Sequence, residues 1–462
     1  MTERAIEKGT ELQGLSTAIL LPSVDLFGAP ARQAVAPLTQ IVGIPLFQRT
    51  VLTLQRAGIR QLIVLAGQEE EHLKHALGKG PRVTIPVRWM PIREFPLDDP
   101  RTWEALAAEV RGFCLLSSVS GVFSRTLIEQ LRQDVEEGTA LVVGEKAPAR
   151  PGKARRGRSL VLPWEDGLGA IADLVVLPAS VLSTATQVPG EAGTIPVRRW
   201  LERAAAEGRV RVRPVQQPTM WFQPVRHARD VGAAERRLLG SLKPEFEGVI
   251  DRYFNRALSR RFTRLFLALG LSPNTITLLA TVVGLSATIA FGLGSYEAGL
   301  VGALLFQLSA VIDCCDGEVA RLTFTESPFG AWLDIAMDNV VHMAIFGGIA
   351  VGAYARAAGE KDAWVPLVLG GAAILGNALS FWLVGRAQKL RQNGGWKTPV
   401  EAAWSDFMLK NIASRDFTVV VLLFALLGKL DLFLWIAAAG SLVFSGVMLW
   451  VVRPSAVGRP HS

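Results

Sequence analysis

Six apolar stretches follow one another after residue 270, and this feature restricts the fold more than any other. They cover approximately residues 275–294, 297–320, 329–356, 363–385, 416–428 and 431–452. Most of them reach the roughly 20 residues that a helix needs to cross a bilayer, and the fifth is short. We therefore expect an all-α transmembrane domain of six helices over residues 271–455.

Acidic side chains interrupt these apolar stretches. The segment DCCDGEVARLTFTESPFGAWLDIAMD holds six acids and one arginine. Ionised groups within a membrane segment cost several kcal/mol unless they are paired, metal-bound or facing water. In two helices, Asp313 and Asp316 share one face and Asp334 and Asp338 share another. Four converging carboxylates suit a hard cation such as Mg²⁺ or Mn²⁺. The alternative is a buried salt-bridge network, for which Arg321 alone supplies too little charge.

The spacing D-x2-D-G-x2-A-R-x8-G-x3-D-x3-D resembles, without a gap, the signature of the CDP-alcohol phosphatidyltransferase family. The resemblance implies that an alcohol hydroxyl attacks a CDP-linked donor, a phosphodiester forms and CMP leaves. It also implies two bound metal ions and a general base at Asp338. The remaining roles that it implies are metal binding by Asp313, Asp316, Asp334 and Asp338, and nucleotide binding by Gly317, Ala320, Arg321 and Gly330.

Three further positions concern the substrates and proton transfer. The family commonly has Pro-Asn-Thr before the first span, which implies that Asn274 contacts the nucleotide; alternatively, Ser272 or Asn274 caps the helix. His342 extends the stripe of Asp334 and Asp338. It is interpreted either as an aid to proton transfer or as a hydrogen-bonding residue in helix packing.

A basic group before the fifth span bears on the acceptor. Arg415 and Asp416 resemble an Arg-acid pair in relatives that use phosphorylated polyols. Arginine suits bidentate phosphate binding, and Lys389 and Arg391 lie nearby in the sequence. These three basic residues indicate an anionic acceptor such as a polyol phosphate. The alternative is the ordinary basic charge of a cytoplasmic loop.

The N-terminal part, residues 1–240, has the pattern of a soluble α/β domain. Strand candidates alternate with helical runs such as residues 45–58, which favours a mainly parallel sheet covered on both faces. The strand candidates are residues 16–22, 61–67, 83–90, 112–119 and 139–146.

The order of these pieces resembles a nucleotidyltransferase of the sugar-nucleotide and cytidylyltransferase type, with a Rossmann-like fold. The residues that bind metal and phosphate in that family are missing here, however. Gln40 or Ile41 stands where the family has a lysine, Ser120 stands where it has a metal-binding aspartate, and the second acid is replaced around residues 221–225. Without these carboxylates Mg²⁺ has no ligands. We expect a catalytically degenerate domain, kept for binding, stability or regulation.

An active cytidylyltransferase with Asp25 or Asp173 as replacement ligands is the alternative. An α/β domain of this kind ahead of such a membrane domain is similar to the bifunctional inositol-phosphate cytidylyltransferases that also synthesise di-myo-inositol phosphate phosphate.

Residues 241–270 join the two domains and predict a basic, amphipathic juxtamembrane helix. The net charge of +8 favours an anionic lipid surface as partner over nucleic acid once membrane spans are present. Basic residues crowd before the first span, between spans four and five and after span six. By the positive-inside rule, both termini are expected on the cytoplasmic side of the inner membrane.

The sequence thus predicts a metal-dependent CDP-alcohol phosphotransferase, and a phospholipid-forming step with CDP-diacylglycerol is the first choice. Synthesis of di-myo-inositol phosphate phosphate from CDP-inositol is the second. A non-catalytic membrane scaffold or transporter is a third interpretation, against which the complete motif argues. The family resemblance further implies a homodimer.

Overall fold

The chain forms two compact units, Met1–Leu242 and Lys243–Ser462. The computed structural model describes most of both units. The described residues are 14–22, 35–78, 83–134, 140–145, 161–164, 167–189, 193–215, 219–242, 256–392 and 416–451.

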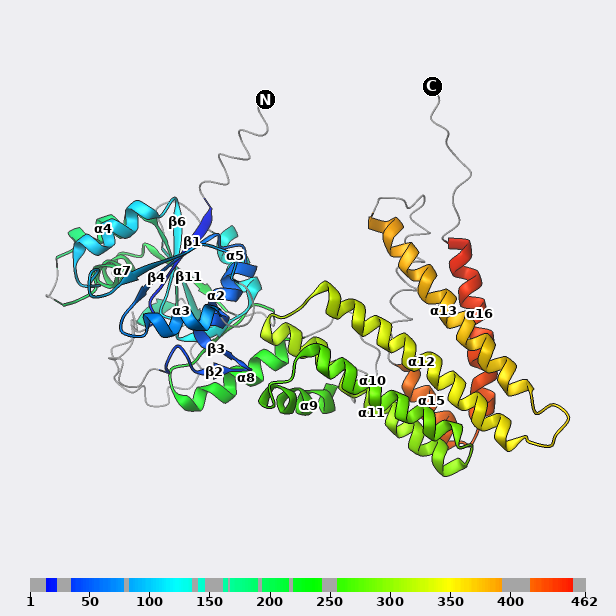
Figure 1. Ribbon diagram of the computed structural model, residues 1–462. Coiled ribbons are helices and arrows are strands. Elements are labelled where there is room, and N and C mark those ends of the chain that lie inside the picture. Colours follow the sequence, from blue (N-terminus) through cyan, green and yellow to red (C-terminus); the bar gives the residue numbers. More distant parts are fainter. Residues whose placement is uncertain are drawn as a thin grey trace, which may run out of the picture. The chain divides into compact units, whose positions relative to one another are not determined.

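The first unit is built on an eight-stranded sheet in the order β11-β8-β10-β6-β1-β4-β5, with β9 paired to β10 (Figure 1). Every strand runs in one direction except β10, which is antiparallel to β6, β8 and β9. Only two residues separate β9 from β10, and so short a connection joins antiparallel strands. The strands of this sheet are β1 (Leu15–Leu20), β4 (Gln61–Ala66), β5 (Val87–Pro91), β6 (Phe113–Ser117), β8 (Ala140–Glu145), β9 (Val161–Trp164), β10 (Gly167–Pro178) and β11 (Val210–Pro214).

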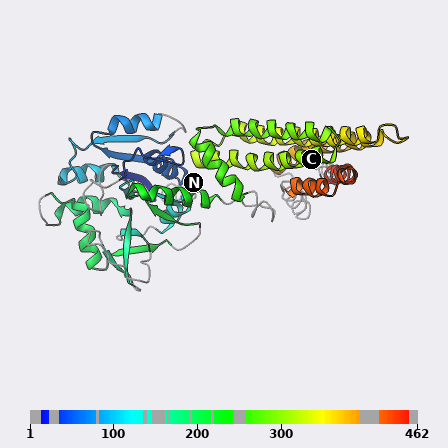
Figure 2. The same ribbon diagram turned by 90° about the horizontal axis from the view of Figure 1, so that it is seen from below.

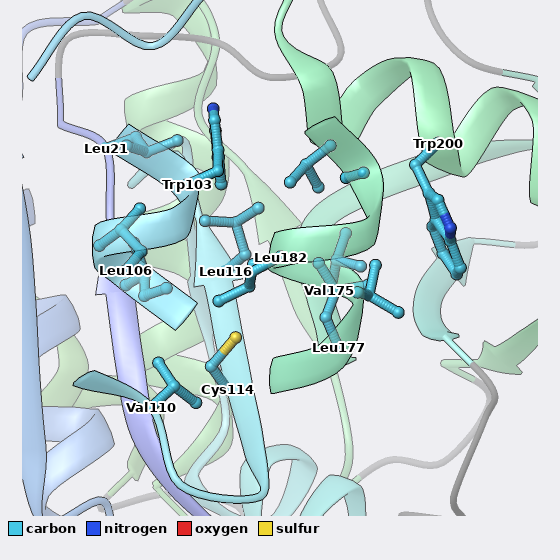
Figure 3. Close-up of a cluster of buried hydrophobic side chains, with 14 of the residues drawn as sticks. Leu21, Trp103, Leu106, Val110, Cys114, Leu116, Val175, Leu177, Leu182 and Trp200 are labelled. Atoms are coloured by element: carbon cyan, nitrogen blue, oxygen red, sulfur yellow. The ribbon is translucent and has the colours of Figure 1, made fainter. Parts of the chain in front are cut away.

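Helices cover both faces of this sheet, which confirms the α/β prediction. Alternate residues of the central strands, such as Cys114 and Leu116 of β6, point into one core with Trp103 (Figure 3). The indole N–H of Trp103 donates to the carbonyl of Leu97 at 2.8 Å. The helices on this face are α4 (Pro100–Glu109), α6 (Ala179–Thr184) and α7 (Pro196–Ala206). The opposite face carries α2 (Leu46–Arg56), α3 (Glu70–Gly78) and α5 (Arg125–Gln133), and α8 (Ala228–Ser241) ends the unit.

Two small two-stranded antiparallel sheets complete this unit. The first pairs β2 (Gln40–Ile41) with β3 (Ile44–Pro45), and the second pairs β7 (Gly121–Phe123) with β12 (Phe222–Pro224). The second sheet joins segments about a hundred residues apart in the sequence.

The described residues of the second unit form helices and their short connections. The described segment begins with α9 (Arg256–Ala268), which packs against α11, and α10, α11 and α12 lie side by side in both views (Figures 1 and 2). The further helices α13 and α16 pack against each other. Their bounds are α10 (Pro273–Gly292), α11 (Tyr296–Thr323), α12 (Pro328–Arg356), α13 (Val365–Gln392), α15 (Asp416–Leu426) and α16 (Leu430–Val451).

Five of these helices, α10 to α13 and α16, are long and apolar enough to cross a membrane. The shorter α15 has 11 residues, or about 16 Å of helix, and the segment 393–415 before it lies outside the described residues. The six-span count therefore stays a prediction. The amphipathic helix predicted within residues 241–270 corresponds to α9 over its described part.

Candidate active site

The acidic motif lies where α11 ends and α12 begins. Four residues connect the two helices, and Ser327 caps α12 by accepting a hydrogen bond at 3.0 Å from the N–H of Gly330. Ser272 caps α10 in the same way through the N–H of Thr275 at 3.2 Å. The cap of α10 is therefore Ser272, one of the two residues that the sequence offered, and Asn274 lies within the first turn.

Three carboxylates of the motif come together. Asp313 and Asp316 of α11 and Asp334 of α12 each offer an oxygen, and these oxygens lie within 4.8 Å of one another. The two α11 side chains are buried, at 5% and 6% exposure. A cation between them would offset their mutual repulsion, and an all-oxygen donor set is the one that Mg²⁺ and Mn²⁺ prefer. The residues present thus fit a hard divalent metal.

Asp316 is oriented by two donors. The hydroxyl of Thr277 on α10 donates to Oδ2, and the backbone N–H of Gly317 donates to Oδ1. Thr277 is 3% exposed. Groups that hydrogen-bond a metal-binding carboxylate fix its orientation. The sequence pattern gave no sign of Thr277, because this threonine lies 39 residues before Asp316.

Two glycines of the motif leave room beside polar groups. A Cβ atom at Gly317 would lie 3.3 Å from Nη1 of Arg321, so the guanidinium folds back over this glycine. A Cβ atom at Gly330 would lie 3.2 Å from Oδ1 of Asn274. The first turn of α10 therefore meets the first turn of α12 at the predicted nucleotide positions. Ala320 lies one turn beyond Gly317 on α11 and is half-buried.

Asp338 lies one turn beyond Asp334 on α12 and is half-buried, and it is not part of the three-carboxylate group. One turn further, His342 is enclosed by aromatic rings. Its ring lies 5.8 Å from that of Phe306 and 5.3 Å from that of Phe417, both in edge-to-face geometry. These contacts agree with a packing function for His342.

The predicted acceptor residues belong to the end of α13 and to the segment before α15. Lys389 and Arg391 belong to the last turns of α13. Arg415 lies outside the described residues, and α15 begins at Asp416.

In the α/β unit, Ser120 and residues 221–225 stand where the resembled family has carboxylates. The structure brings these two segments together. The N–H of Val225 donates to the carbonyl of Ser120 at 2.7 Å, and β7 pairs with β12 between them. The hydroxyl of Ser120 lies 3.3 Å from that of Ser118, and Gln223 stands on β12. Within the described part of the chain, the three-carboxylate group is the one set of His, Cys, Asp or Glu side chains close enough for a metal. The described α/β unit thus has a serine at the first position and neither Asp nor Glu among residues 221–225.

The position where the resembled family has a lysine is held by Gln40 or Ile41. Gln40 and Ile41 form β2, and the following turn holds Val42 in the left-handed region at φ 51°. The buried Arg49 donates to the carbonyls of Ile41 and Val42 at 2.9 and 3.2 Å. Burial lowers the pKa of Arg49 to about 9, against the opposing charge of Glu235. The guanidinium of Arg49 therefore stabilises the turn by hydrogen bonds to its backbone.

Comparison with known proteins finds a family match in the second unit. Residues 270–454 match the sequence model of the family described as CDP-alcohol phosphatidyltransferase. This part of the chain, less than half of it, is thus similar to the CDP-alcohol phosphatidyltransferase family. The eight motif positions and the three converging carboxylates lie within this CDP-alcohol phosphatidyltransferase region, and the predicted enzyme class is confirmed.

A relative covers both units. The protein named bifunctional IPC transferase and DIPP synthase from Rubrobacter xylanophilus is 29% identical over 368 residues, 76% of this chain and 80% of its own. An alignment of this length extends from the CDP-alcohol phosphatidyltransferase region into the α/β unit. The protein of the same name from Aquifex aeolicus is 23% identical over 324 residues, 68% of this chain and 72% of its own.

Among solved structures, phosphatidylinositol phosphate synthase from Mycobacterium tuberculosis with CDP-DAG bound is 20% identical to this chain, with a TM-score of 0.33. The match covers 45% of this chain and all of that one.

Proposed function

We propose that this enzyme transfers a phosphatidyl or phospho-alcohol group from a CDP-linked donor to a polyol phosphate and releases CMP. The observation that carries the proposal is the convergence of Asp313, Asp316 and Asp334 within a complete family motif. These carboxylates and Asp338 would hold one or two Mg²⁺ or Mn²⁺ ions at the membrane. When bound, the ions stabilise negative charge on the donor pyrophosphate and on the leaving CMP.

Other residues near the carboxylates take part in proton transfer, nucleotide binding and acceptor binding. Asp338, one turn beyond Asp334 on α12, accepts the proton of the acceptor hydroxyl. Arg321 and Asn274 contact the nucleotide beside the two glycines, where a Cβ atom would crowd them. Lys389, Arg391 and Arg415 bind the phosphate of the acceptor.

The names of the relatives support an inositol phosphate as acceptor. Proteins named for phosphatidylinositol phosphate synthesis and for DIPP synthesis both match this chain. The donor is then CDP-diacylglycerol or CDP-inositol. We place the protein in the cytoplasmic membrane as a homodimer with both termini in the cytoplasm, in agreement with the basic loops.

The decisive experiment measures CMP release by the purified protein with Mn²⁺ or Mg²⁺, using each donor with a panel of polyols and polyol phosphates. We expect Asp338→Asn to reduce the rate by about a hundredfold or more, the usual contribution of a general base. The matched control is Glu326→Gln, which removes an exposed acid between α11 and α12. Equal rates in both variants would contradict the assignment of Asp338.

We propose further that the α/β unit is a binding or regulatory unit and does not itself form the CDP-linked donor. The support is that Ser120 stands where the family has a metal-binding aspartate and that residues 221–225, where the second acid is expected, contain neither Asp nor Glu. Pyrophosphate release from CTP with inositol phosphate tests this. Release that persists in an Asp338→Asn protein would establish an active cytidylyltransferase instead.

A further inference from the structure

Glu318 is a buried acid that the proposed reaction does not use. It lies two residues after Asp316 on α11 and is 5% exposed. Its two oxygens accept hydrogen bonds from two hydroxyls of α9, at 3.2 Å from Ser259 and at 2.6 Å from Thr263. Both donors are completely buried. A carboxylate removed from water is costly unless such donors satisfy it, so this three-residue contact requires a fixed position of α9 against α11.

The same stretch of α11 is held from a second helix. Asp316 accepts from Thr277 of α10, whereas Glu318 accepts from α9. The thiol of Cys315, between them in the sequence, lies 3.5 Å from the carbonyl of Ser259 on α9 and 3.3 Å from that of Val311 on its own helix. Residues two positions apart on a helix point in different directions, so the two contacts resist rotation of α11 about its axis.

Rotation of α11 matters because it carries two of the three carboxylates. A small turn of the helix would move the oxygens of Asp313 and Asp316 away from Asp334, which belongs to α12. Metal sites need their ligands held to a fraction of an ångström by the residues behind them.

We propose that Glu318 is a positioning residue, and that Ser259 and Thr263 clamp it so that α9 sets the orientation of the metal-binding carboxylates. This inference rests on the proposed metal-dependent function. It gives the juxtamembrane helix a part in the active site, since the chain enters the membrane unit through α9.

Mn²⁺ binding to the purified full-length protein, measured by electron paramagnetic resonance, tests the proposal without any substrate. We expect Thr263→Val, which keeps the side-chain shape and removes the hydroxyl, to raise the dissociation constant for Mn²⁺ about tenfold. Glu318→Leu should act in the same direction. Thr263→Ser should restore the affinity, and Glu318→Gln, which can still pair with both hydroxyls, should stay near the wild type.

The matched control is Ser445→Ala. It removes a buried hydroxyl that bonds the carbonyl of Gly376 at 2.9 Å and thus links α16 with α13, away from the clamp. Unchanged Mn²⁺ affinity in Thr263→Val, with only a lower melting temperature, would overturn the inference. Failure of the proposed function would be recognised separately, as absent CMP release from a wild-type protein whose Mn²⁺ binding still responds to Thr263→Val.

Discussion

The hydroxyl of Thr277 on α10 donates a hydrogen bond to Oδ2 of Asp316 on α11. The contact joins the first membrane helix to a proposed metal ligand 39 residues later. Each oxygen of Asp316 thus accepts a hydrogen bond, because Oδ1 accepts from the N–H of Gly317, and the two bonds fix the orientation of the carboxylate.

Replacement of this threonine tests the contact. We expect Thr277→Val to raise the metal concentration for half-maximal CMP release by between about ten- and a hundredfold, with a smaller change in the maximal rate at saturating metal. Thr277→Ser should retain the wild-type value. Thr281→Val is the control, because that hydroxyl bonds only a backbone carbonyl of the same helix in the contacts described, at 2.9 Å. A shift of equal size in both valine variants would contradict a specific role for Thr277.

His342 offers a second test, because the sequence left its function open. Its ring packs edge-to-face against Phe306 and Phe417, which favours packing over proton transfer. We expect His342→Phe to keep CMP release within about threefold of the wild type and to leave its pH dependence unchanged, since general-base loss would cost a hundredfold or more. Loss of the alkaline or acidic limb of the pH profile in this variant would instead assign proton transfer to His342.

The sequence predicted the site where spacing along one helix decides the geometry. Asp313 and Asp316, or Asp334 and Asp338, fall on one face by helical periodicity, and the family signature supplied the pairing of the two helices. Thr277, Ser259 and Thr263 escaped prediction because their partners come from other helices. A lone hydroxyl in an apolar segment carries no pattern that names its partner.

The fold shows the same division. The strands and the helix over residues 45–58 were predictable from alternation and helical period, and they correspond to β1, β4, β5, β6, β8 and α2. The reversal of β10 and the pairing of β7 with β12 depend on contacts between distant segments. Such pairings are decided by the packing of the whole sheet, which local pattern does not reveal.

Cys114 allows a prediction for the α/β unit. It is buried in the core beside Leu116, and burial raises the pKa of its thiol from 9.0 to about 12. A raised pKa means that the neutral thiol is favoured in the folded state. The contribution of Cys114 to the free energy of unfolding is therefore fully present below pH 9 and is lost as the pH rises from 9 toward 12.

Alkylation followed by peptide mass spectrometry measures this difference. At pH 8 we expect Cys114 of the native protein to remain unmodified by iodoacetamide over hours, and to react within minutes in denaturant. Rapid labelling of Cys114 in the native protein would show that the core around β6 opens readily, in disagreement with its burial.

The last prediction concerns the close approach of α12 to the turn between α10 and α11. A Cβ atom at Gly352 would overlap the backbone carbonyl of Phe291 and lie 3.1 Å from Cα of Gly294. Backbone atoms cannot move aside as a flexible side chain can, so we expect Gly352→Ala to destabilise the membrane unit by about 1–3 kcal/mol.

Gly371→Ala on α13 is the matched control, because nothing lies within 4 Å of its added Cβ atom and alanine is the better helix former. Thermal loss of the monodisperse protein in detergent should occur at a lower temperature for Gly352→Ala and at an unchanged or higher one for Gly371→Ala. Nη1 of Arg356 donates to the carbonyl of Gly294 at 2.7 Å and also joins α12 to this turn. Equal melting temperatures of the two variants would mean that α12 can shift away from the turn despite this hydrogen bond.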